Sequence, residues 1–303
     1  MNKILLLLII VVGTAVGCQQ PAATPTPPPT AEPTATSLPP TPITPPLGAG
    51  MRYSRYGSWY DPGPDYWAGV AQQMAGYFPS AVPQAVWIVG TVGGQGTALN
   101  FPGQTDKPYI YFTSQDKNEE VLTLFDEMGG QVWLQVEPGH ADVETLIHIL
   151  LERYGRHPSV VGVGIDVEWY GSVATAKGTP VTDEVAQQWV AAARSHGEQY
   201  RIFLKHWLPA YMPPTYRDGL FFIDDSQGFA SLEEMVSEFT TWGKIFAPSP
   251  VGFQYGYQSD RKWWQELENP PQAIGEQLIT AVPHTAGLYW VDFTVLDMFP
   301  PER

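Results

Sequence analysis

The sequence predicts an α/β protein whose main domain is a closed (β/α)8 TIM barrel. Apolar strand-like runs alternate with amphipathic helical patterns from about residue 85 to the end, without clustered hairpin signals. This order is typical of parallel strands joined by right-handed helical crossovers. Seven such runs and one candidate first strand give the eight strands of a barrel, and a domain of about 250 residues has the usual size. An open doubly wound sheet is the alternative, but no glycine-rich dinucleotide-binding fingerprint follows the first strand.

The first 18 residues have the pattern of an export signal. A basic start at residues 1–3 precedes an apolar run over 4–12, which is shorter than the about 20 residues of a membrane-spanning helix. The segment then reads "AVGC" and ends at Cys18, the only cysteine of the chain. This resembles the lipobox of bacterial lipoproteins, with alanine where leucine is usual. The resemblance implies that Cys18 carries a lipid and anchors the protein at the cell membrane, facing the extracellular side or the periplasm. An ordinary signal peptide is the alternative.

Residues 19–49 have the composition of a linker. Eleven prolines and seven threonines stand between positions 21 and 47, with few residues that could build a core. Such segments are extended and semi-rigid. The sequence therefore predicts a disordered tether over 19–49 and one domain over 50–303.

The elements of that domain follow from its apolar periodicity. We expect the first strand around 53–60 and the first helix over 66–77. The seven further strand-like runs lie at 85–90, 131–137, 160–168, 201–207, 220–225, 251–257 and 287–293. Between them, a helix over 142–154 carries an apolar stripe at i, i+3, i+4, i+7 and i+8 and is stopped by Gly155.

Capping residues mark two more helices. Thr182 can cap a helix over 182–195, and Ser231 followed by Glu234 forms a capping-box pattern that opens another helix. Each helix lies between two predicted strands, as a barrel requires.

Charge and motif content exclude several classes of function. The net charge is −15 and the chain has no basic stripe, so we expect no nucleic-acid partner. The six histidines show no ligand-pair spacing, and neither a G-x-S-x-G elbow nor a phosphate-binding P-loop occurs. We therefore expect no metal, no cofactor and no serine chemistry, and a monomeric protein.

Carboxylates stand at the ends of several predicted strands. Successive residues of a strand point to opposite faces, so in 161–168 one face is Gly162, Gly164, Asp166 and Glu168. In a barrel this face points inward, and its last members reach the carboxyl-terminal mouth, where barrel active sites lie. Other strand ends bring further acids to this rim: Glu137, Asp225 and Asp292. We expect these three to contact a substrate bound at the mouth.

The same run resembles a known signature. "VGVGIDVE" is similar to the fourth-strand pattern D-G-x-D-x-D-x-E of family-18 glycoside hydrolases, the chitinase-like group. Gly162, Asp166 and Glu168 match, whereas Val161 and Gly164 replace the first two aspartates. Family-25 lysozymes also carry a D-x-E on a strand, but their first-strand D-x-S is absent here. The closing run "GLYWVDF" resembles the last strand of family 18 as well.

This resemblance implies a surface-anchored glycosidase acting on an N-acetylated glycan such as chitin or peptidoglycan. Glu168 would be the general acid, and Asp166 would orient the acetamido group that attacks the anomeric carbon. Trp290 would floor the sugar subsite. Gln254 and Tyr255 would hydrogen-bond the sugar, although strand alternation points Tyr255 away from the mouth.

Three alternatives remain open at this point. Without an acetamido group on the substrate, Glu137, Asp225 or Asp292 would have to act as nucleophile or base. Because half of the acidic series is missing, the domain could be a glycan-binding lipoprotein without turnover. The paired acids could also serve only to hold a cation such as Arg201 or Lys205.

Overall fold

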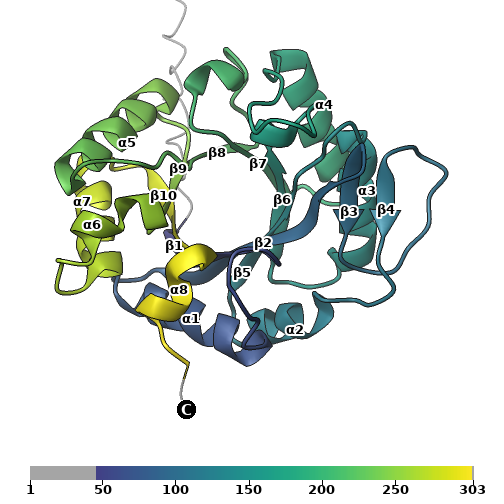
Figure 1. Ribbon diagram of the computed structural model, residues 1–303. Coiled ribbons are helices and arrows are strands. Elements are labelled where there is room, and N and C mark those ends of the chain that lie inside the picture. Colours follow the sequence, from purple (N-terminus) through teal and green to yellow (C-terminus); the bar gives the residue numbers. More distant parts are fainter. Residues whose placement is uncertain (1–45, 302–303) are drawn as a thin grey trace, which may run out of the picture. The chain divides into compact units, whose positions relative to one another are not determined.

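Eight parallel strands form a closed barrel in the computed structural model, which describes residues 46–301 (Figure 1). β1 (Gly48–Tyr53) pairs with both β2 (Val82–Gly93) and β10 (Thr285–Val291), and this double pairing closes the sheet. The other barrel strands each pair in parallel with the next along the chain: β5 (Gln131–Val136), β6 (Val160–Asp166), β7 (Arg201–Lys205), β8 (Leu220–Asp224) and β9 (Val251–Tyr255). The predicted TIM barrel is confirmed.

The described residues belong to one compact unit. The expected signal peptide, Cys18 and the expected linker up to residue 45 lie outside them. Within 46–301, no helix combines the length and the apolar character needed to cross a bilayer.

Helices surround the barrel on its outside (Figure 1). They are α1 (Pro64–Gly76), α2 (Glu119–Glu127), α3 (Val143–Tyr154), α4 (Asp183–Arg194), α5 (Leu232–Phe246), α6 (Arg261–Trp264), α7 (Pro270–Ala281) and α8 (Asp292–Met298), with short 3-10 turns at Val167–Trp169, Pro209–Tyr211 and Gln258–Asp260. The predicted caps are confirmed, because Thr182 accepts a hydrogen bond from the amide of Val185, and Ser231 accepts one from the amide of Glu234. Gly155 ends α3 as expected.

Two expectations about strands are wrong. The first strand is Gly48–Tyr53 rather than 53–60, and residues after Tyr53 form a loop. A Cβ at Gly50 would lie 1.8 Å from the carbonyl oxygen of Gln84, so this position requires glycine. Because glycine has a low strand propensity, the sequence pattern did not indicate a strand here.

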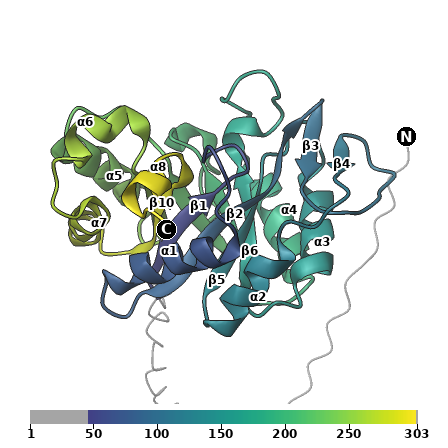
Figure 2. The same cartoon turned by 60° about the horizontal axis from the view of Figure 1, so that its bottom comes forward.

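A hairpin also interrupts the parallel pattern. β2 continues beyond the barrel and turns at Gly94 into the antiparallel β3 (Gly96–Leu99), on which β4 (Ile110–Phe112) pairs. Figure 2 shows β3 extending beyond the rim of the barrel.

The barrel interior and the layer beneath the helices are packed separately. Apolar residues on the outward faces of the strands form one large core with the helices. A smaller cluster fills the interior: Val86, Trp133, Phe203, Phe221, Ile223, Ala286 and Tyr289. Gly164 makes room for this cluster, because a Cβ there would lie 2.0 Å from the ring of Phe203. The lower barrel is therefore packed largely with aromatic rings, among which Gln84 is bonded to Gln131 and to the hydroxyl of Tyr289.

Candidate active site

Three carboxylates meet one lysine at the mouth of the barrel. Lys205, the last residue of β7, places its Nζ 3.0 Å from Asp166 Oδ2, 2.7 Å from Glu168 Oε1 and 2.5 Å from Asp225 Oδ2. Asp166 ends β6, Glu168 lies in the 3-10 turn that follows, and Asp225 follows β8. All four residues are buried. Lys205 is one of the two cations named in the alternative interpretation of the paired acids.

The lysine is held as an ammonium. Burial alone would lower its pKa, but the charges of Asp166, Asp225 and Glu168 outweigh burial and raise that pKa well above its ordinary value. A permanently protonated amine is no nucleophile, so Lys205 acts as a fixed positive charge between the acids.

The acids around this charge differ in their affinity for protons. Burial and the neighbouring charge of Asp225 raise the pKa of Glu168 well above its ordinary value. Burial also favours a protonated Asp225, but the Lys205 ammonium prevails and holds the pKa of Asp225 below its ordinary value. For Asp166, burial raises the pKa to about 7 against the opposing effect of Lys205. Neighbouring carboxylates with pKa values pushed apart are the arrangement that separates a proton donor from an ionised partner.

A solvent-open cavity of about 280 Å³ lies beside two of these acids. Its walls are Glu168, Trp207, Asp225, Ser226 and Gln227. Asp166 is not in this lining, and only 2% of its surface is exposed. A bound molecule in this cavity would therefore touch Glu168 and Asp225, with Asp166 behind them.

Glu137 also reaches the mouth. Its Oε1 accepts a hydrogen bond from the Tyr56 hydroxyl at 2.5 Å, and its Oε2 accepts one from the amide of Val92 at 2.9 Å. Both oxygens of Glu137 are thus already bonded.

Asp292 is likewise engaged within the protein. Arg52 Nη2 donates to its Oδ1 at 2.6 Å, and the hydroxyl of Ser54 donates to Oδ2 at 2.7 Å. The amide of Ser54 donates to the same Oδ2. Asp292 joins the end of β10 to the start of the loop after β1, so its contacts are structural.

The structure does not bring Tyr255 and Trp290 to the mouth, and the expectation that they line the sugar site is corrected. Tyr255 points into the helix layer, where its hydroxyl donates to the carbonyl of Pro271 at 3.1 Å. Trp290 is fully buried beside it and donates to the hydroxyl of Thr294 at 2.9 Å.

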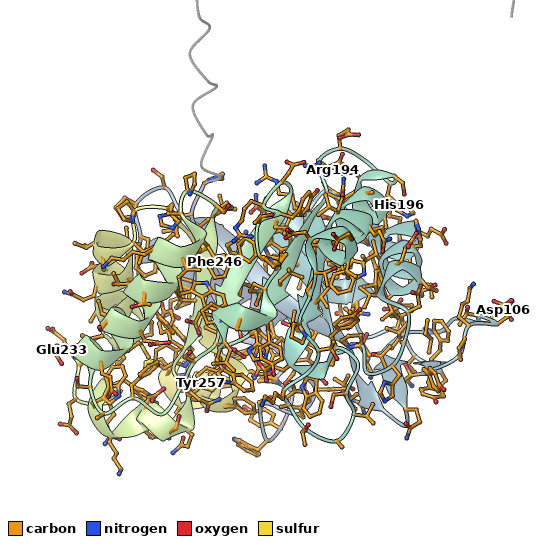
Figure 3. The ribbon with its side chains drawn as sticks, turned by 90° about the horizontal axis from the view of Figure 1, so that it is seen from above. Asp106, Arg194, His196, Glu233, Phe246 and Tyr257 are labelled. Carbon is orange, nitrogen blue, oxygen red and sulfur yellow. The ribbon has the colours of Figure 1, made fainter. Side chains whose placement is uncertain are left out.

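Gln254 faces inward as expected, and Tyr257 joins it. Regular strand alternation would point Tyr257 outward like Tyr255, but Gly256 adopts φ +87°, a conformation that residues other than glycine rarely take, and the chain turns there. Tyr257 then donates to Gln254 Oε1 at 3.4 Å. In Figure 3, Tyr257 lies toward the same end of the domain as Glu233, at the start of α5, and away from Arg194.

Sequence reasoning missed several residues of the mouth. Tyr56, Arg52 and Trp207 lie in segments without a recognisable motif. Lys205, by contrast, was among the cations named as possible partners of the acids, and a buried lysine does need acidic partners. The sequence also suggested no close histidine pair, yet His148 Nδ1 and His196 Nε2 lie 2.7 Å apart between α3 and the end of α4. Within residues 46–301 no group of three or more histidine, cysteine or acidic side chains has the arrangement of a metal site.

Comparison with known proteins yields distant structural matches. No family model and no curated protein matches the chain. A Bacteroides thetaiotaomicron structure provisionally named an α-L-fucosidase aligns at 13% identity and TM-score 0.48, over 85% of this chain and 92% of its own. A Parabacteroides merdae β-glucuronidase aligns at 11% identity and TM-score 0.46, over 81% of this chain and 31% of its own. The Rhodococcus endo-glycoceramidase II aligns at 8% identity and TM-score 0.42, over 80% of this chain and 72% of its own. Likeness at this level assigns no family.

Proposed function

We propose that this protein is a glycoside hydrolase in which Glu168 is the general acid and Asp225 the ionised partner. One observation carries the proposal: two carboxylates that line one cavity share the Lys205 ammonium and have pKa values displaced in opposite directions. Hydrolysis of a glycosidic bond needs such a pair, one carboxyl to protonate the leaving oxygen and one carboxylate facing the anomeric carbon.

The spacing of the pair favours a retaining reaction. One nitrogen lies 2.7 Å from Glu168 Oε1 and 2.5 Å from Asp225 Oδ2, so these two oxygens are at most about 5 Å apart. The carboxyl groups of retaining enzymes stand about 5 Å apart, and those of inverting enzymes about 6.5–9.5 Å. In the first step Glu168 gives its proton to the glycosidic oxygen, Asp225 forms a bond to the anomeric carbon, and the bond between that carbon and the glycosidic oxygen breaks, so that the leaving sugar departs as an alcohol. Water then attacks that carbon, returns a proton to Glu168 and releases Asp225.

The substrate we propose is an N-acetylated glycan of the chitin or peptidoglycan type. Support comes from the likeness of residues 161–168 to the family-18 signature, in which Asp166 and Glu168 occupy the last two acidic positions. The resemblance implies that this aspartate orients an attacking acetamido group, but Asp166 lies behind the cavity, so in this proposal Asp225 and not the acetamido group attacks the anomeric carbon. Asp166 is then a positioning residue, since it contacts Lys205 and accepts a hydrogen bond from Gln135 Nε2 at 3.2 Å.

The test is hydrolysis of aryl glycosides and N-acetylglucosamine oligomers by the full chain. We expect Glu168→Gln and Asp225→Asn each to lower kcat by about 10²–10⁴-fold. Glu127→Gln is the matched control, because Glu127 is an exposed acid at the end of α2. Unchanged hydrolysis in Glu168→Gln would refute the assignment of the acid.

A second candidate is a glycan-binding protein without turnover. The observation that favours it is the 2.7 Å contact between Lys205 and Glu168, which ties the acid to a cation. Val161 and Gly164, in place of two aspartates of the signature, point the same way. Glycan binding by wild-type protein with no hydrolysis, left unchanged in Glu168→Gln, would select this candidate.

We further propose that the protein is a monomer anchored to the cell membrane through a lipid on Cys18. Support comes from the apolar run and the small residues before this single cysteine. Detergent phase partitioning of the protein expressed in a bacterial host should place wild type in the detergent phase and Cys18→Ser in the aqueous phase. Equal partitioning would contradict the anchor.

A further inference from the structure

A second cavity, of about 410 Å³, lies at the rim of the barrel beyond the loop that follows β1. We call it the rim pocket, and its walls include Ser54, Trp59, Tyr60, Asn100, Gln115 and Lys117. Its volume is within the about 300–1,000 Å³ of small-molecule sites. Side chains with hydroxyl, amide and ammonium groups line it together with aromatic rings, which suits a ligand that has both hydroxyl groups and apolar faces.

Aromatic side chains dominate the exposed apolar surface at this end of the domain. Of the eight large hydrophobic side chains that are exposed within residues 46–301, five follow the carboxyl ends of barrel strands: Tyr56, Trp59, Tyr60, Leu208 and Phe293. Trp59 is the extreme case, with 86% of its surface exposed, and its ring lies 4.3 Å from that of Tyr60. Exposed rings beside a polar cavity are suited to stacking against the C–H face of a pyranose.

The loop that carries Trp59 is fixed to the framework. Asp61 accepts hydrogen bonds from the Tyr53 hydroxyl at 3.0 Å and from Trp67 Nε1 at 2.8 Å. Tyr53 in turn stacks on Trp87 at 3.7 Å between ring centroids. A platform anchored in this way loses little conformational entropy on binding a ligand.

The opposite wall is equally well anchored. Asp116 accepts hydrogen bonds from Arg153 Nη2 at 2.6 Å and from the amide of Asn118 at 2.9 Å. Asn118 also donates to Asn100 Oδ1 at 2.7 Å. These contacts hold Gln115 and Lys117 beside the cavity, so the rim pocket is bounded by two fixed walls.

The same loop connects the rim pocket with the carboxylates of the mouth. Tyr56, three residues before Trp59, donates to Glu137 at 2.5 Å, and desolvation of its hydroxyl together with the charge of Glu137 raises its pKa against the opposing charge of Arg52. Ser54 lines the rim pocket and also donates to Asp292. The loop therefore extends from the mouth to the rim, and one chain-like ligand could contact both.

We propose that the rim pocket binds a sugar unit of a long N-acetylated glycan at a distance from the bond beside Glu168. The inference rests on the proposed function for the identity of the ligand. Trp59 stacks on the sugar ring, and Gln115 and Lys117 supply hydrogen bonds to it. The substrate is then a polymer, and a small glycoside that fills only the cavity beside Glu168 gains nothing from Trp59.

The experiment measures binding and turnover separately in the full chain. Binding of an N-acetylglucosamine hexamer and of peptidoglycan glycan strands is measured by calorimetry in the Glu168→Gln background, with Trp59→Ala, Trp59→Tyr and Ile245→Ala added. Ile245 is an exposed apolar residue of α5 and serves as the control. We expect Trp59→Ala to weaken binding of at least one glycan about tenfold, and Trp59→Tyr and Ile245→Ala to change it by less than about threefold.

Turnover of a short aryl glycoside by the Trp59→Ala single variant should equal that of wild type. The proposal would be overturned if Trp59→Ala in the Glu168→Gln background bound both glycans as tightly as Glu168→Gln alone. It would also be overturned if Glu168→Gln alone bound neither glycan. Glycan binding that depends on Trp59 in a protein that hydrolyses nothing would support the rim pocket and reject the hydrolase, so the two failures are distinguishable.

Discussion

Replacement of Lys205 by methionine gives the sharpest test of the interpretation of the mouth. The Lys205 ammonium is buried and lies within 3.0 Å of three carboxylates. Methionine has a similar length but no charge, so Lys205→Met leaves the buried acids without their counter-ion. Removal of one partner from a buried ion pair costs about 3–5 kcal/mol, because the remaining charge stays desolvated. We expect a loss of stability of this size at pH 8.

The loss should shrink in acid. Without the lysine, burial raises the pKa values of the folded carboxylates above the about 3.9–4.3 of the unfolded chain. At pH values between the pKa of the unfolded chain and the higher pKa of the folded variant, the folded variant still binds protons that the unfolded chain has released. Its stability therefore falls as pH rises through this range. At pH 5 the acids are partly protonated, and the difference between variant and wild type should be smaller than at pH 8.

Urea unfolding followed by tryptophan fluorescence at pH 5 and pH 8 measures both effects. Lys262→Met is the control, since Lys262 is an exposed residue of α6 and such a change is worth less than about 0.5 kcal/mol. A loss below about 1 kcal/mol at pH 8, or an equal loss at both pH values, would refute the view that Lys205 neutralises buried charge.

Two further predictions concern the fold. Gly256→Ala places a side chain at φ +87° with its Cβ 2.3 Å from the ring of Trp290, and should lower the free energy of unfolding by about 1–3 kcal/mol. Gly69→Ala, on the open face of α1, should raise the free energy of unfolding by about 0.5–1 kcal/mol. Thermal denaturation that ranks the two variants the other way would be contrary to this reasoning. Burial and the neighbouring His148 lower the pKa of His196, so below about pH 6.5 the unfolded chain takes up a proton before the folded one does and stability falls. Thermal melts between pH 5 and pH 8 should show this slope flattened in His196→Gln, and an unchanged slope would count against it.

Much of the barrel could be predicted because most of its strands carry a clear apolar pattern. Alternation along the 131–137 run agrees with the structure, in which Trp133 lies inside the barrel and Leu134 beneath the helices, since each face of that strand has one kind of neighbour. The first strand escaped because its glycines are required by contact with Gln84, a residue that only the fold brings near.

The candidate site was predictable in its acids but not in their pairing. Strand ends correctly brought Glu168 and Asp225 to one mouth. Which acid faces a cavity and which lies behind it depends on the position of Lys205, which belongs to a third strand. Alternation also failed after Gly256, because a single residue of positive φ reverses the direction of the next side chain. The proposed role of Trp59 could not be predicted from the sequence either, since a loop residue belongs to no periodic pattern that would indicate its neighbours.

Closure of the sheet by β1 and β10 has a consequence for biogenesis. These two strands come from opposite ends of the domain, yet they pair residue by residue, and Arg52 bonds Asp292 across the same seam. While β10 is still within the ribosome, the nascent chain therefore presents two strand edges with unpaired backbone groups, on β1 and on β9. Such edges are prone to pair with other chains. Early termination before residue 285 should thus yield an aggregating species rather than a smaller folded domain, and the acidic mouth would be complete only when translation is almost over.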